Sequence, residues 1–459
     1  MTRPAPPSHS RRPRNHRRGF ATLLVFGVLV FAALALAMVQ ASAFGQAGSG
    51  REALARVRAE WAARAGVEAA LARLEAEVDR GDQGDAFGQL EAMAQVADGD
   101  LEGSTWRVRS LQDGREVAGP EDAAAKININ RMTRDQLLTI EPFMTEDVAD
   151  SVLDWIDADD DTRELGAEIG YYKGLTYPVE PRNDVMRSVA ELELVAGVDP
   201  KDVRGEDWNL NGILDPNEDD GDASWPPDNQ DGILDRGWSG VLTTYSSESP
   251  LALSGQERLD LTVASLNDIV SRLGVTQPQG QAVRDSVDHV QGIRQTDFVR
   301  YPLGTLNRQA ARNQGKSQQE QRQAARVQAL TNEQIGKVLD ECSMGSAQLA
   351  TFIPGRLNVN TCDAKTMEFL AEIDPSLADA IIAERSGRSN GFTSVADLLE
   401  VDGMTRQNLA DIAELLTTRS SVYVVHSKGR DERTGLEVEV SAVLDASTLP
   451  AVKREVRVR

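Results

Sequence analysis

One stretch of the sequence places oxygen-bearing side chains at the spacing of a calcium-binding loop. These side chains occupy positions 1, 3, 5, 9 and 12 of the stretch and belong to Asp207, Asn209, Asn211, Asp215 and Glu218. Glycine at position 6 permits a sharp turn, and Ile213 at position 7 offers its backbone carbonyl, as in an EF-hand loop. Because Pro216 lies inside the stretch, we expect an EF-hand-like loop without the full helix–loop–helix. The alternative is an acidic turn that only faces water.

A second stretch repeats part of this pattern. Asn229, Asp231 and Asp235 match the middle of the first loop, and the glycine between them is retained. Acids are missing at the first and last positions, so one of the aspartates at 219, 220 and 222 would have to complete the site. We interpret this stretch as a weaker candidate for an independent calcium site.

A third stretch keeps the spacing of the carboxylates and loses the glycine. Asp157, Asp159, Asp161 and Glu168 occupy positions 1, 3, 5 and 12, and position 6 is threonine. Crowded carboxylates repel one another unless a cation lies between them. This favours a bound calcium ion, and an exposed turn whose charges face water is the alternative.

The remaining residues with catalytic chemistry do not form a recognisable active site. His289 and His426 have no nucleophile motif nearby, and no glycine-rich loop of the phosphate-binding type is present. The carboxylates occur at calcium spacing rather than in an apolar setting that would raise one pKa. We therefore expect no enzyme activity and calcium as the cofactor.

Cys342 and Cys362 are the two cysteines of the chain. Two are too few for a disulfide-rich scaffold or a four-cysteine zinc site. In an oxidising compartment they would form a disulfide or remain as two buried thiols, and the sequence favours neither.

The charge of the chain argues against nucleic acid as a partner. The net charge is −23, and the first 19 residues hold six arginines and no acid, so the rest of the chain is more acidic still. Proteins that bind nucleic acid need a basic surface that displaces counterions from phosphate. We expect a body that repels anionic surfaces and binds cations.

The N-terminus predicts an anchored, exported protein. Residues 20–39 form an uncharged apolar run preceded by arginines, and a helix of that length spans the core of a bilayer, with the arginines in the cytoplasm. The junction at Gly19 and Phe20 resembles a prepilin leader, which is cut before the apolar helix. A secretory signal cut after Ala43 and an uncleaved signal anchor are the alternatives. Pilin-like subunits usually have Glu at the fifth mature position, which here is Leu24.

The rest of the chain predicts an α+β fold with sheet material at both ends. After a glycine-containing hinge at 45–50, residues 51–78 have the spacing of an amphipathic helix, with Leu54, Val57, Trp61 and Leu74 expected on its packed face. Residues 105–111, 422–427 and 436–443 alternate as strands do, and 428–435 reads as a hairpin loop. We expect a long N-terminal helix and an antiparallel sheet, with a large all-α domain inserted.

The insert contains an internal repeat. Asn128-Ile-Asn130 and Asn358-Val-Asn360 each precede a helical pattern, and a weaker copy lies at 258–262. We expect these polar residues to cap the coming helices. Residues 376–415 have the pattern of helix-hairpin-helix repeats, whereas 305–330 is either an exposed helix or a linker.

Several of these motifs together resemble general secretion pathway protein K, a minor pseudopilin of type II secretion. The strongest are Asp154-Trp-Ile-Asp157 with the following Tyr171-Tyr172, and the stretch from Ser188 to Val198. The Arg-Arg-Gly leader, Leu24 and the two Asn-x-Asn motifs fit the same family. The resemblance excludes 200–240 and roughly 270–345, which read as insertions.

This resemblance implies the following organisation. We expect a leader at 1–19, a transmembrane helix at 20–39, a pilin-like helix and first strands at 40–122, a helical domain at 123–420 and closing strands at 421–459. It implies calcium in the helical domain, cleavage and N-methylation by prepilin peptidase, and contacts with minor pseudopilins I and J and with secreted proteins. The subunit would sit at the periplasmic tip of an inner-membrane pseudopilus, where it starts assembly and aids export.

Two other functions remain open. One is a tip subunit of a type IV pilus. The other is a membrane-anchored DNA-uptake receptor, because 356–415 resembles the helix-hairpin-helix of such receptors. The acids in 363–415 weigh against the second, since that motif needs basic residues near phosphate.

Overall fold

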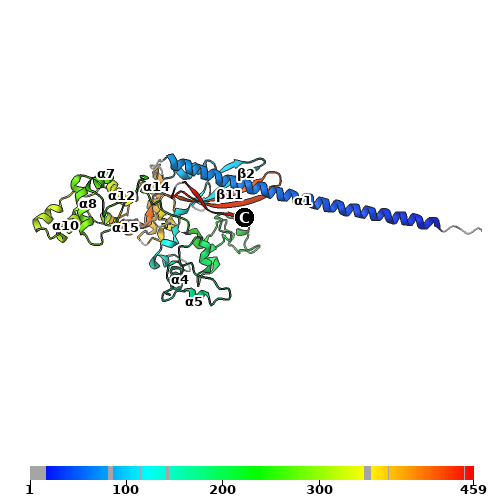
Figure 1. Cartoon of the computed structure of the whole chain (residues 1–459), viewed down its shortest axis with the longest axis horizontal. Coiled ribbons are helices and arrows are strands. Elements are labelled where there is room, and N and C mark those ends of the chain that lie inside the picture. The colour runs from blue at the N-terminus through cyan, green and yellow to red at the C-terminus, as the bar shows by residue number, and fades with distance from the viewer. Residues whose placement is uncertain are drawn as a thin grey trace, which may run out of the picture.

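The computed structural model describes residues 17–80, 86–112, 115–140, 144–345, 353–370, 372–448 and 450–459. Helix α1 (Arg17–Arg80) projects from one end of the molecule, and the sheet packs against its C-terminal part (Figure 1). The helical insert extends from the sheet in two directions, one along the axis of α1 and one to the side. This arrangement confirms the predicted α+β class, with its long N-terminal helix, antiparallel sheet and inserted helical domain.

Helix α1 is continuous over 64 residues. By length and composition it is able to cross a membrane, and none of its most apolar window is buried against the described protein. The expected hinge at 45–50 is wrong, because the helix runs through Gly45, Gly48 and Gly50 without a break. A glycine costs a helix interior only about 1 kcal/mol, which the long flanking stretches offset.

The second half of α1 packs on the sheet through small side chains. The buried residues of this face are Ala55, Ala59, Ala62, Ala63, Val67, Ala70 and Leu74. A Cβ atom at Gly429 would lie 1.9 Å from the carbonyl oxygen of Ala59, so the helix touches the sheet backbone there. The prediction for Leu54, Val57 and Trp61 is therefore wrong, since they are 50%, 50% and 62% exposed. Close backbone contact excludes large side chains and leaves them on the other faces.

The sheet has seven strands, which pair antiparallel in the order β1-β2-β11-β12-β13, with β3 beside β2 and β4 beside β11. Their bounds are β1 (Asp98–Asp100), β2 (Ser104–Gln112), β3 (Arg115–Ala118), β4 (Glu121–Asp122), β11 (Val422–Asp431), β12 (Glu437–Asp445) and β13 (Val452–Val458). The three predicted strands lie mostly within β2, β11 and β12, although β11 extends to Asp431, into the predicted hairpin loop. Because β4 pairs with β11, the insert leaves and re-enters the sheet at neighbouring strands.

The insert is mainly helical. Its α-helices are α3 (Arg134–Leu137), α4 (Glu146–Ile156), α5 (Ile169–Tyr172), α6 (Pro200–Arg204), α7 (Leu266–Leu273), α8 (Gln277–His289), α9 (Asp297–Arg300), α10 (Leu303–Asn313), α11 (Gln318–Ala324), α12 (Asn332–Glu341), α13 (Ala364–Glu368), α14 (Pro375–Gly387) and α15 (Arg406–Ile412). Helix α2 (Gly88–Ala94) precedes the insert and packs on α1. The segment 305–330, which the sequence left open, forms most of α10 and all of α11.

Three short parallel strand pairs divide the insert into three repeats. The pairs are β5 (Ile127–Asn128) with β6 (Leu242–Thr243), β7 (Leu259–Asp260) with β8 (Cys342–Ser343), and β9 (Leu357–Asn358) with β10 (Leu416–Thr417). We name the segments that they close the first repeat (126–244), the second repeat (258–343) and the third repeat (356–418). The first has its own buried apolar cluster, whereas the second and third share one, and a further cluster lies between α1 and the sheet.

The Asn-x-Asn motifs act as clamps more than as helix caps. The side chain of Asn130 accepts from Met186 N and donates to Met186 O, at 2.6 and 3.0 Å. Asn360 does the same with Phe392, at 2.8 and 2.9 Å. The clamped segments lead into 3-10 helices η3 (Val189–Leu194) and η6 (Val395–Glu400), so each motif joins the start of its repeat to one of these helices. Asn128, the first residue of its motif, does act as a helix cap. Its side chain caps the short 3-10 helix Ile129–Arg131.

Candidate metal centres

The first acidic centre lies at the C-terminal end of α4. The apolar face of this helix is buried in the first repeat, and Trp155 meets Tyr172 of α5 edge-on, with ring centroids 5.1 Å apart. The opposite side of the last turn therefore presents Asp154 and Asp157 toward the loop that carries Glu168. Asp154 is fully buried, and a Cβ atom at Gly166 would lie 2.0 Å from its Oδ2.

Glu168 is buried without a hydrogen-bond partner. It is 3% exposed, and neither of its carboxylate oxygens makes a hydrogen bond, nor does Oδ1 of Asp157. Burial, with the nearby charge of Asp154, raises the pKa of Glu168 to about 7. Arg163 donates to Asp154 at 2.6 Å and to Asp157 at 2.5 Å, so it neutralises these two acids without reaching Glu168. Buried carboxylate oxygens without a partner are costly, and they suit a cation ligand.

The residues at this centre differ from those that the sequence predicted. Asp159 and Asp161 are exposed, and Oδ1 of Asp159 accepts the backbone N–H of Asp161. Sequence reasoning missed Asp154, which lies one helical turn before Asp157 and faces the same way. Its signal was the i, i+3 spacing of Asp154 and Asp157 at the end of α4.

The 207–218 loop is held together by hydrogen bonds to its own backbone. Asp207 accepts the backbone N–H groups of Asn211 and Gly212, at 2.9 and 2.8 Å. Gly212 has φ +67°, the left-handed conformation that the sharp turn requires. Glu218 at position 12 is 1% exposed and accepts the N–H groups of Trp208 and Asp215.

The oxygen-bearing side chains of this loop converge. Asn209 and Asn211 both donate to Oδ2 of Asp215, at 2.8 and 2.9 Å. Ile213 donates its N–H to Asn211. Burial raises the pKa of Glu218 to about 7 and also raises the pKa of Asp207. The loop therefore brings together the side chains that the sequence named for a cation.

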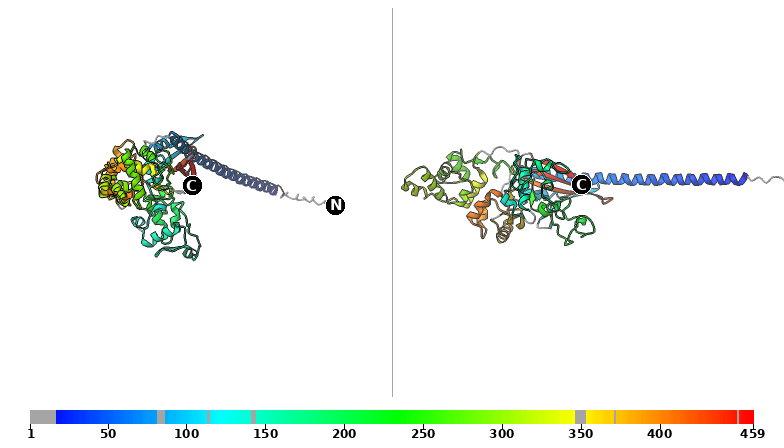
Figure 2. Two further views of the ribbon diagram at one scale, coloured as in Figure 1. Left: turned by 60° about the vertical axis from the view of Figure 1, so that its left-hand side comes forward. Right: turned by 90° about the horizontal axis from the view of Figure 1, so that it is seen from below.

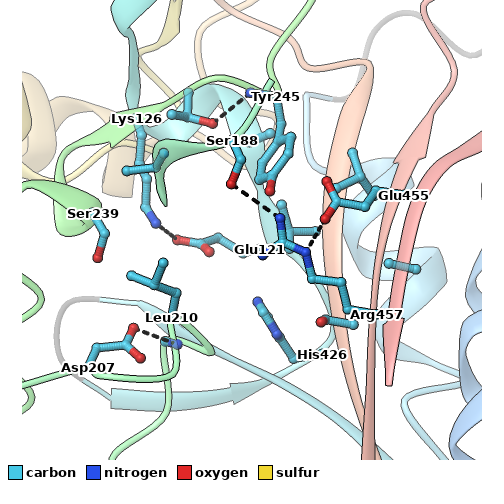
Figure 3. Close-up of a pocket in the computed structure, with 18 of the residues that line it drawn as sticks. Glu121, Lys126, Ser188, Asp207, Leu210, Ser239, Tyr245, His426, Glu455 and Arg457 are labelled. Carbon is cyan, nitrogen blue, oxygen red and sulfur yellow. Dashed lines mark hydrogen bonds and ion pairs between the residues drawn. The ribbon is translucent and has the colours of Figure 1, made fainter. Parts of the chain in front are cut away.

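The loop docks against the sheet beside a cavity of about 90 Å³ (Figure 3). Asn211 donates to Glu439 of β12 at 3.2 Å, and Lys428 of β11 lies 3.6 Å from Asp215. Asp207 and His426 both line the cavity, and Lys126 pairs there with Glu121 at 2.9 Å. A ligand in this loop would thus sit at the seam between insert and sheet.

The third candidate, at 229–235, is the most exposed. Asn229 and Asp231 accept N–H groups within the loop, and Asp235 accepts that of Gly237. Glu206 accepts the N–H groups of Asn229 and Asp235, at 3.2 and 3.1 Å. Glu206 therefore accepts hydrogen bonds from both ends of this loop, as Glu218 does in the 207–218 loop. The spacing of the sequence did not indicate Glu206, because it lies outside the loop.

Asp219 accepts the N–H of Gly232, so one of the three aspartates proposed to complete this site does reach the loop. Within the described ranges, however, no three His, Cys, Asp or Glu residues form a group that could hold a metal ion by themselves. A calcium ion at any of these loops would need amide, carbonyl or water oxygens as well, which calcium accepts.

The remaining site residues are at the cysteines and the leader. Cys342 and Cys362 are both free and buried, and burial raises the pKa of each thiol to about 12. Gly19 and Phe20 lie in the first turns of α1, and the side chain of Phe20 is 72% exposed. Leu24 is 55% exposed on the same helix. Most of the predicted leader, residues 1–16, lies outside the described residues.

Two family models match parts of the chain. Residues 108–205 match the model of type II secretion system protein K, and residues 355–417 match the helix-hairpin-helix motif. A solved structure, the GspK-GspI-GspJ complex of the enterotoxigenic Escherichia coli type 2 secretion system, has a similar chain with 12% identity and a TM-score of 0.45. The match covers 90% of this chain and 99% of that chain. No curated protein matches the sequence. Residues 108–205 are therefore similar to type II secretion system protein K, and residues 355–417 are similar to the helix-hairpin-helix motif.

Proposed function

We propose that this protein is a minor pseudopilin at the tip of a type II secretion pseudopilus, where it starts assembly and aids export of folded proteins. The observation that carries the proposal is the family domain joined to α1, whose apolar first part is exposed and whose second part packs on an antiparallel sheet. The role is structural, with no catalytic step. The proposed location is the inner membrane, with the N-terminus cytoplasmic and the body periplasmic.

The position of the protein in the filament follows from its first helix. Prepilin peptidase would cut between Gly19 and Phe20 and methylate the new N-terminus, and α1 would remain as the anchor. A buried charge in a membrane needs a partner, which in pilins is thought to be a neighbouring N-terminal amine. Leu24 is uncharged and needs no such partner, as expected of the subunit that ends a filament. The proposed neighbours are minor pseudopilins of the I and J types, and secreted proteins are proposed as further contacts.

We also propose that the insert holds calcium. The support is the convergence of oxygen-bearing side chains at 207–218 and the unpartnered carboxylate of Glu168 beside Asp157. A hard divalent cation takes such oxygen ligands, and it would favour the ionised form of acids whose pKa burial raises.

The decisive experiment is the N-terminal mass of the protein recovered from membranes. Processed protein starts at Phe20 with an added methyl group, and Gly19→Ala should block the cut. Gly27→Ala is the matched control, because a Cβ atom there meets nothing within 4 Å. Protein that starts at Met1, or after Ala43, would contradict the proposal. Co-purification with I- and J-type subunits, rather than with type IV pilus subunits, separates the two kinds of filament.

A further inference from the structure

Helices α10 and α11 form a basic surface on an acidic protein. Residues 301–330 contain five Arg or Lys residues and a single acid, although the chain has a net charge of −23. The five are Arg308, Arg312, Lys316, Arg322 and Arg326. All five are exposed, and none forms an ion pair in the part of the chain that the structure describes. The acid, Glu320, accepts hydrogen bonds from Ser317 at the start of α11.

The fold displays these cations on a fixed scaffold. Asn307 of α10 donates to the carbonyl oxygen of Ala324 at 3.0 Å, and a Cβ atom at Gly304 would lie 2.4 Å from the carbonyl oxygen of Ala325. The two helices are therefore held in contact. Helix α11 buries no side chain of its own. Its exposed residues contribute no core packing.

The spacing of the arginines is unfavourable for the helices themselves. Arg308 and Arg312 lie four residues apart on α10, whereas Arg322 lies on α11 and Arg326 lies in the turn that follows it. Like charges at this spacing repel one another on a helix surface. In the described residues neither Arg308 nor Arg312 forms an ion pair that would offset this repulsion.

The pair of helices α10 and α11, which we call the α10–α11 hairpin, lies at the end of the molecule farthest from the start of α1. Figure 1 and the right-hand view of Figure 2 both place α10 at the end opposite to the projecting helix. The orientation of the hairpin rests on the proposed function: if α1 lies in the inner membrane, the hairpin points away from that membrane.

We propose that the α10–α11 hairpin is a docking surface for the acidic face of a partner protein. An extended polyanion, such as a membrane or a long nucleic acid, would also meet the repulsion of the acidic body, whereas a compact acidic face meets the hairpin alone. In 301–330 the one exposed large apolar or aromatic side chain is Tyr301, at 42%. Membrane insertion or base stacking would need more of them.

The test is binding of a short labelled peptide of alternating glutamate and glycine to the full chain in detergent micelles. We expect binding at low ionic strength that high salt removes. Replacing Arg308, Arg312, Arg322 and Arg326 by Gln should weaken it about tenfold, and replacing all four by Lys should retain it. The matched control replaces four exposed cations elsewhere by Gln: Arg115, Lys173, Lys365 and Arg433.

Anionic lipid vesicles and a short DNA duplex are the comparison probes. The proposal stands if the peptide binds and if the two comparison probes bind more weakly. It is overturned if the Gln variant binds the peptide as the control does, or if vesicles or duplex bind more tightly and lose binding in the same variant. These results do not depend on where the leader is cut, so failure here and failure of the pseudopilin proposal are distinguishable.

Discussion

The first and third repeats have the same framework but use it differently. Each begins with an Asn-x-Asn clamp, continues through a 3-10 helix that starts within a Ser-Val-Ala sequence and then a short α-helix, and ends in a Leu-Thr-Thr strand. In the third repeat the buried Asn360 makes three hydrogen bonds, to Phe392 and Thr418. In the first repeat Glu168 and Asp157 keep buried oxygens without partners.

The two repeats also differ in the loops that connect their shared elements. The first repeat carries its acidic loops in the connections after α4 and after α6, whereas the third connects the same elements directly. Loops tolerate insertion, since they leave the packed elements in place. We infer that the third repeat is a structural copy and that the first binds a ligand.

Removal of calcium should have the largest effect, because it should destabilise the first repeat and leave the third unchanged. With calcium about 1,000-fold above its Kd, chelation should lower the free energy of unfolding by about 4 kcal/mol. Hydrogen exchange should rise across 146–218 and stay unchanged across 356–418. Glu168→Gln should reduce the effect, whereas Asp379→Asn, at an exposed position of the third repeat, should retain it. Equal changes in both repeats would contradict the comparison.

Removal of the two clamps should show which repeat is held more tightly. Asn360→Ala leaves three buried partners unsatisfied and should cost about 3 kcal/mol, whereas Asn130→Ala affects two partly buried bonds and should cost about 2 kcal/mol. Urea unfolding measures both. The exposed Asn390→Ala is the control, with an expected change within about 0.5 kcal/mol. A larger cost at Asn130 would contradict the expectation that the third repeat is held more tightly than the first.

The pH dependence of the metal-free protein should give the smallest effect. The pKa of Glu168 rises from 4.5 to about 7 on folding, so its contribution is favourable below pH 4.5 and is lost as the pH rises through about 7. Glu168→Gln should remove this loss and leave the variant about 1–2 kcal/mol more stable than the parent above pH 7, after solvent screening. Thermal unfolding from pH 4 to 8 measures it, and parallel curves for parent and variant would refute it.

The sequence predicted the parts that depend on local pattern. The apolar run from Phe20 predicts a helix because nothing in it breaks the spacing, and alternation predicts the positions of β2, β11 and β12. The 207–218 loop follows from its own spacing, because all its oxygen-bearing side chains come from one short segment. The close approach of α1 to Gly429 was not predictable, since the small residues that permit it lie far apart in the chain.

Sequence alone thus determined the apolar first part of α1, the main strands of the sheet, the repeated motifs and the positions of the acidic loops, because each is encoded within a short stretch of chain. Tertiary structure decided that Asp154 replaces Asp159 and Asp161 beside Glu168, and that Glu206 spans a loop it does not belong to. It also decided that Asn130 and Asn360 act as clamps. The physical reason is the same in each case: burial and hydrogen bonding join groups that are distant in sequence, and only packing sets which groups meet.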